Sequence, residues 1–146
     1  MPETRLLIPA LGSLYRTLAP VTEVLIRLCA GLSLAAHGFP KLFGGTAANA
    51  AFFEQAGFHP AIFWTLLTGC TEFFGGLCLA LGLLTRLAAG PVLVFLLVAV
   101  SFHFQNGFYW NKLGFEYPLF WAIVVFHFLV RGGGPWSLDA WIGREV

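Results

Sequence analysis

Charged side chains are scarce in this chain. Only 10% of its 146 residues are Asp, Glu, Lys or Arg, whereas 58% are hydrophobic, and the net charge is +1. With a mean hydropathy of +0.81, a domain of this length cannot hide so many apolar side chains inside itself. The lack of any basic block excludes a nucleic-acid partner. These absences predict an integral membrane protein whose surface is covered by membrane lipids.

Sulfur-based redox and metal motifs are also lacking. The three cysteines, Cys29, Cys70 and Cys78, lie in hydrophobic runs, and no CxxC or Cys/His metal spacing is present. Cys70 and Cys78 would be about 12 Å apart along one helix, which is too far for a disulfide between them. We therefore expect buried free thiols and no metal site, with a bridge from Cys29 to Cys70 or Cys78 as the less favoured alternative.

Four apolar segments are candidates to cross the bilayer: about 20–38, 61–84, 87–105 and 115–131. Backbone groups in hydrocarbon must be paired within their own segment, so these spans are helices. The short connection at Thr85 and Arg86 makes the second and third helices antiparallel neighbours. No linker-like stretch is present, so the prediction is a single all-α membrane domain over residues 1–146, a compact up-down bundle of four transmembrane helices.

Two shorter helices are predicted outside the spans. Leucines recur at helical spacing between Leu7 and Leu18, which favours an N-terminal helix lying in the membrane interface. An alanine-rich stretch from Thr46 to Ala56, followed by Gly57, predicts a short helix on the outer surface.

Basic residues near the span ends divide unequally between the two sides of the membrane. One side carries Arg5, Arg16, Arg86, Arg131 and Arg144, and the other carries Lys41 and Lys112. Because cytoplasmic ends are enriched in Lys and Arg, both termini are predicted to be cytoplasmic.

Charged residues also occur inside the predicted spans. Glu23, Arg27, His37 and Lys41 stay within an arc of roughly 80° at helical periodicity. Glu72 lies near mid-depth of the second span, on a face of small residues that lets a neighbouring backbone approach. An unpaired carboxylate there costs roughly 3 kcal/mol on insertion scales. Two interpretations are equally supported: an intramembrane ion pair of Arg27 with Glu72, or a Glu23–Arg27 pair at i,i+4 that leaves Glu72 protonated.

Further polar residues gather near the predicted outer boundary. They are His37, Lys41, His103, Asn106 and Glu116. Each has a structural explanation by itself, such as capping a helix or reaching toward headgroups. Together, ionisable groups on faces turned toward the bundle indicate a functional site. We predict a shared pocket in which these residues and Glu72 bind a ligand or relay protons.

The order and spacing of several short motifs resemble the DoxX family. The matching segments are R-L-C-A-G at 27–31, H-G at 37–38 followed by K-L-F at 41–43, F-E-Q-A-G-F-H-P at 53–60, Glu72 with the glycines at 75–76, G-L-L-T-R at 82–86, N-G-F at 106–108, E-Y at 116–117, Gly134 and S-L-D at 137–139. Together they extend over about residues 24–140, nearly the whole chain.

The resemblance implies a four-helix, multi-pass protein of the inner (cytoplasmic) membrane with a link to redox chemistry. The related DoxD subunit belongs to a thiosulfate:quinone oxidoreductase, and DoxX-like proteins are linked to thiol and oxidative-stress systems. The implied role is a quinone-linked redox or oxidative-stress subunit that acts with a soluble or membrane partner protein, and a homo-oligomer is compatible with it. For an enzymatic role, the resemblance implies the membrane subunit of a quinone-dependent oxidoreductase.

In this hypothesis His37 or His103 hydrogen-bonds a quinone carbonyl, and Glu72 or Glu116 relays the proton. One alternative is a module that binds or transports a small molecule without redox chemistry, and another is a scaffold for partner proteins. Haem held by His37 and His103 is a further alternative. No catalytic residue is assigned.

Overall fold

The computed structural model describes residues 6–145, and this part of the chain contains helices and no strand. The long helices are α1 (Gly12–Leu42), α3 (Ala61–Leu81), α4 (Thr85–His103) and α5 (Glu116–Arg131). The shorter elements are α2 (Thr46–Gln55), α6 (Leu138–Ile142) and the 3-10 turns η1 (Pro9–Leu11), η2 (Phe104–Asn106) and η3 (Trp110–Lys112). The all-α prediction is confirmed for the described residues.

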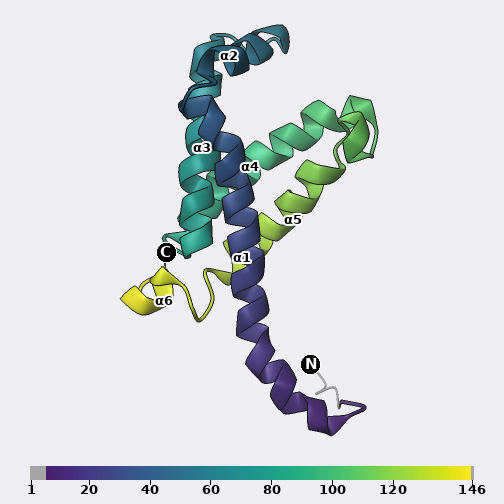
Figure 1. The fold of residues 1–146 in the computed structure, drawn as a ribbon, viewed down its shortest axis with the longest axis vertical. Coiled ribbons are helices and arrows are strands. Elements are labelled where there is room, and N and C mark those ends of the chain that lie inside the picture. The colour runs from purple at the N-terminus through teal and green to yellow at the C-terminus, as the bar shows by residue number, and fades with distance from the viewer. Residues whose placement is uncertain (1–5, 146) are drawn as a thin grey trace.

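The long helices alternate in direction but form two pairs (Figure 1). α1 packs along α3, α4 packs along α5, and the pairs diverge toward the end that holds α2 and the connection between α4 and α5. Where the pairs meet, the buried core consists of Ala30, Leu34, Leu79, Ala89, Val92, Leu96, Trp121, Ala122, Val125 and Phe128. The prediction of a compact bundle is therefore correct only for the region around this core, because the two pairs separate at the other end.

Within residues 6–145, three helical stretches are long and apolar enough to cross a membrane: Pro9–Leu42, Ala61–Leu81 and Thr85–Asn106. α5 has 16 residues, which at the helical rise is about 24 Å, shorter than the bilayer core of about 30 Å. The fourth crossing over residues 115–131 stays a prediction. α2 forms within the stretch predicted to be a short helix, and its place on the outer surface also stays a prediction.

The predicted N-terminal interfacial helix is not a separate element. α1 begins at Gly12 and continues through Pro20 to Leu42 as one helix of 31 residues, about 46 Å long at the helical rise. A proline removes one backbone hydrogen bond from a helix, but here it does not end it. The exposed Leu14 and Leu18 therefore lie on an extension of the first span, which projects beyond the packed helices (Figure 1).

Glycines allow the backbones of α1 and α3 to come into direct contact. A Cβ atom added at Gly31 would collide with backbone atoms of Gly76 and Ala80, and one added at Gly76 would collide with the backbone of Gly31. Gly38 is similarly close to the carbonyl oxygen of Gly69. Close contact through small residues is the usual way for helices to associate in lipid, and the predicted role of the small-residue face of the second span is confirmed.

The cysteines are free thiols, but the prediction that they are buried is wrong for two of them. Cys29 and Cys70 are exposed on the outer faces of their helices, and Cys78 is half-buried. Lipid tails are as apolar as a protein core, so a weakly polar thiol gains little by turning inward.

Replacing Gly76 with alanine should destabilise the protein by about 1–3 kcal/mol, because the added methyl group forces α1 and α3 apart. The matched control is Gly90→Ala in α4, where a Cβ would meet no atom within 4 Å. That variant should be neutral or up to about 1 kcal/mol more stable, because alanine favours the helix. Denaturant titration in detergent measures the free energy of unfolding, and equal values for both variants would contradict the close contact.

Candidate functional site

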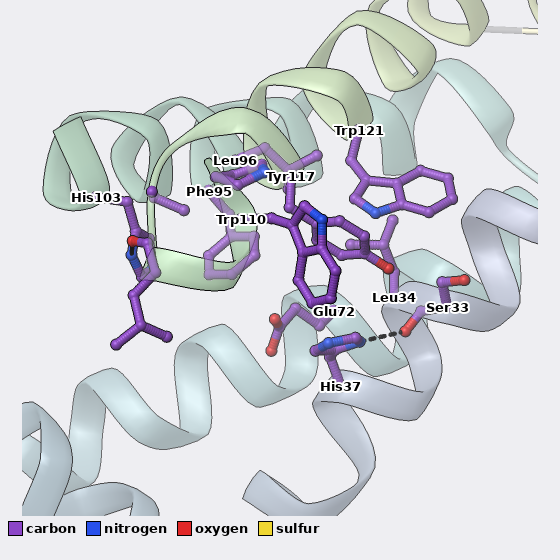
Figure 2. Close-up of a pocket in the computed structure, with 14 residues that line it drawn as sticks. Ser33, Leu34, His37, Glu72, Phe95, Leu96, His103, Trp110, Tyr117 and Trp121 are labelled. Carbon is purple, nitrogen blue, oxygen red and sulfur yellow. Dashed lines mark hydrogen bonds between the residues drawn. The ribbon is translucent and has the colours of Figure 1, made fainter. Parts of the chain in front are cut away.

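A cavity of about 600 Å³ lies between the diverging helix pairs (Figure 2). Its lining comprises Ser33, Leu34 and His37 from α1, Glu72 from α3, Phe95, Leu96, Ala99 and His103 from α4, and Trp110, Leu113, Gly114, Tyr117, Pro118 and Trp121 from the following segment and α5. The size lies within the range of about 300–1,000 Å³ that is typical of small-molecule sites, which are mostly apolar with a few placed polar groups. Of the predicted site residues, His37, Glu72 and His103 meet here.

The cavity is open at an aromatic rim. Trp110 keeps 65% of its surface exposed and Tyr117 keeps 46%, although both line the cavity. Trp121, further inside, is buried and packs edge to face against Tyr117. Aromatic side chains therefore line both the exposed edge of the cavity and its interior.

His37 lies in the interior of α1, because the helix continues past it to Leu42. It therefore does not cap a helix end. Its Nδ1 atom is 2.8 Å from the backbone carbonyl oxygen of Ser33, one turn earlier. This bond fixes the orientation of the ring beside Tyr117, whose ring centre is 6.4 Å away (Figure 2).

His103, at the end of α4, is held by the segment that returns toward α5. Its Nδ1 atom is 2.7 Å from the carbonyl oxygen of Leu113. Asn106 donates its side-chain amide to the same oxygen at 3.1 Å. Leu113 has a φ of 59°, in the left-handed region that non-glycine residues rarely adopt. Asn106 does not line the cavity as predicted. Its side chain instead bonds to the same backbone oxygen as His103.

Glu116 also lies outside the cavity lining. Its carboxylate accepts a hydrogen bond from the backbone N–H of Trp110 at 3.0 Å. Glu116 begins α5, so this bond ties the segment that carries Trp110 to the first turn of the helix. Glu116, predicted to line the pocket, instead holds the backbone of Trp110, which does line it.

Glu72 is the buried carboxylate of the cavity, with 4% of its surface exposed. It forms an ion pair with Lys41, which lies in the last turn of α1. The Lys41 ammonium is also 5.5 Å from the ring centre of Phe95, within the range of a cation–π contact. Lys41 is therefore joined to the cavity through two of its lining residues.

Arg27 does not pair with Glu72, so this prediction is wrong. Arg27 is 3% exposed and donates to three backbone carbonyl oxygens: Ala80 at 3.2 Å, Trp136 at 2.9 Å, and Gly133. Because α1 and α3 run in opposite directions, Arg27 is level with Ala80, which is about 12 Å along α3 from Glu72.

The alternative pairing of Glu23 with Arg27 is not formed either. The Glu23 carboxylate is 3.3 Å from the guanidinium of Arg131 at the end of α5. Glu23, Arg27 and Lys41 are therefore paired with groups from α3, α5 and the C-terminal segment, and His37 alone of the four bonds within α1.

Asp139 has a structural role that the sequence did not reveal. Its carboxylate is buried and accepts hydrogen bonds from the backbone N–H of Leu84 at 2.7 Å and from that of Thr85 at 2.9 Å, and from the Thr85 hydroxyl at 2.7 Å. It thus binds the start of α4 from a position 54 residues away. In the sequence, S-L-D at 137–139 is only part of the family resemblance, and no local pattern identifies the partner of Asp139.

The helices and the cavity define a helical membrane protein with a cavity lined by aromatic side chains. Among residues 6–145, no cluster of three or more His, Cys, Asp or Glu side chains is placed to hold a metal ion. The sequence model of the DoxX family matches residues 23–105, which is more than half of the chain. The protein therefore belongs to the DoxX family.

One relative is the protein named "Uncharacterized membrane protein Rv3486" of Mycobacterium tuberculosis (strain ATCC 25618 / H37Rv). It is 29% identical over 149 residues, which cover 94% of this chain and 91% of that protein. No solved structure matches the chain.

Replacing Lys41 with methionine should destabilise the protein by about 3–5 kcal/mol, because Glu72 is then left as a buried carboxylate without its partner. The double variant Lys41→Met with Glu72→Leu should recover most of this loss, since no unpaired charge remains. Denaturant titrations of these two variants and of the single variant Glu72→Leu complete a double-mutant cycle. The cycle gives the coupling free energy between Lys41 and Glu72. Purely additive effects would show that the pair contributes nothing.

Proposed function

We propose that this protein is a quinone-binding membrane subunit that takes part in redox or oxidative-stress chemistry together with a partner protein. The observation that carries the proposal is the cavity, in which two imidazoles and one buried carboxylate are set among aromatic side chains. A planar aromatic headgroup fits such walls, and its polar oxygens need hydrogen-bonding groups at the cavity surface. When bound, a quinone supplies two-electron, two-proton chemistry that the side chains lack.

The roles of the side chains follow from their positions. His37 and His103, from α1 and α4, would hold the oxygens of the headgroup, and imidazoles can exchange protons near neutral pH. Glu72 lies within the same lining and can hold or release a proton next to Lys41. Trp110, Tyr117 and Phe95 provide the aromatic walls and exclude water from the ring. The partner would supply or remove electrons.

We further propose that the protein lies in the inner membrane with four crossings, α5 being the fourth, and with both termini in the cytoplasm. α5 supports this with outward apolar side chains at Ile123, Phe126 and Val130. Arg86 forms a 3.4 Å ion pair with Glu145, so it lies close to the C-terminal segment. This agrees with the excess of arginines assigned to the terminal side.

Purification in mild detergent, followed by extraction and mass spectrometry, should recover a bound quinone. His37→Ala and His103→Ala should each lower the occupancy of the quinone or its reduced form about threefold at limiting ligand, because each removes one hydrogen bond worth about 0.7 kcal/mol. His127→Ala is the matched control, because His127 lies on α5 outside the cavity lining and should not change occupancy.

Other outcomes would replace the proposal. Recovery of bulk lipid alone, together with Glu72-dependent uptake of a solute into liposomes, would support the transport alternative. A Soret band in the absorption spectrum would support haem. No bound molecule and no uptake would favour the scaffold.

A further inference from the structure

The two histidines of the cavity are held in the same way, although they come from different helices. Nδ1 of His37 is 2.8 Å from the carbonyl oxygen of Ser33, and Nδ1 of His103 is 2.7 Å from that of Leu113. A carbonyl oxygen only accepts hydrogen bonds. Each Nδ1 atom must therefore carry a proton, and in the neutral imidazole Nε2 is left with a lone pair and no hydrogen.

Neither Nε2 atom has a partner among the described residues, and both rings line the cavity. Glu72 adds a third acceptor, its carboxylate already receiving one hydrogen bond from Lys41. The cavity thus presents imidazole nitrogens and carboxylate oxygen that accept hydrogen bonds from whatever binds.

Groups that can donate also line the cavity. They are the hydroxyls of Ser33 and Tyr117 and the indole N–H groups of Trp110 and Trp121. These donors do not distinguish a hydroxyl from a carbonyl, because the oxygen of either group accepts a hydrogen bond. The acceptors do distinguish them, since only a hydroxyl can donate to an imidazole lone pair. A carbonyl placed there would leave two lone pairs facing each other and both groups without a partner.

We propose that the cavity selects an aromatic diol, the quinol form of a quinone, over the oxidised quinone, because His37 and His103 both face the ligand as hydrogen-bond acceptors. This rests on the proposed function and narrows it to one redox form of the ligand. The arrangement discriminates in the same manner as enzyme sites that reject an analogue lacking one hydroxyl.

The test compares a matched pair of probes, tetramethyl-1,4-hydroquinone and tetramethyl-1,4-benzoquinone, on the full chain in detergent. Binding is measured by titration calorimetry without oxygen at about pH 8, where free imidazole is neutral. The hydroquinone should bind about tenfold more tightly, as expected for two additional hydrogen bonds.

Removing the imidazoles should remove the preference. His37→Leu and His103→Leu should each lower it to about threefold, and the double variant should bind both probes equally. His127→Leu, outside the cavity lining, is the matched control and should keep the tenfold preference.

A second measurement does not depend on the variants folding. Nitrogen NMR of histidine-labelled protein distinguishes the two neutral forms of imidazole, and His37 and His103 should both carry the proton on Nδ1. Finding it on Nε2 in either ring would overturn the inference.

The outcomes separate the two proposals. Equal binding of both probes, or tighter binding of the benzoquinone, would overturn this inference and leave the quinone site in place. Binding of neither probe would overturn the proposed function together with it.

Discussion

The backbones of α1 and α3 pass so close at Gly31 and Gly76 that no methyl group fits between them. This contact fixes the register of the two helices, because a shift by one residue would place a side chain where only hydrogen fits. Once the register is fixed, Lys41 at the end of α1 meets Glu72, and His37, one turn before Lys41, lines the cavity. The candidate site therefore depends on a glycine contact outside it.

Buried charge imposes the second constraint. An ionised group in a low-dielectric interior must be paired or hydrogen-bonded, and the two central charges meet this requirement differently. Glu72 has a lysine as its partner, whereas Arg27 binds three carbonyl oxygens at the opposite end of the α1–α3 contact. A guanidinium with five N–H groups can satisfy several carbonyls at once. Arg27 thereby joins α1 to α3 and to the C-terminal segment.

The cavity exists because the second helix pair diverges from the first. At one end, Asp139 binds the start of α4 and the core residues bring the pairs together. At the other end, hydrogen bonds to Leu113 and Trp110 shape the segment between α4 and α5 into a wall. Divergence alone would leave a gap for lipid, and this wall turns it into a cavity with defined polar groups. The proposed binding of quinol relies on both ends.

Much of the architecture was predictable because it depends on local composition. Long apolar runs in a lipid solvent must be helices, so the all-α fold follows from the sequence. The small-residue face of α3 likewise followed from spacing along one helix. The continuity of α1 could not be predicted in this way. Pro20 is compatible with either a break or a continuous helix, and the structure shows a continuous one.

The site itself was only partly predictable. His37, Glu72 and His103 could be singled out because ionisable groups are rare in spans, and the structure brings all three to one cavity. Asn106 and Glu116 were expected to line it, but they hold the neighbouring backbone. The sequence by itself determined the apolar helices and their unusual polar residues, since both depend on the chemistry of single segments. The tertiary structure alone decided the partners of Arg27 and Glu72, because helix register is set by contacts between residues far apart in the chain.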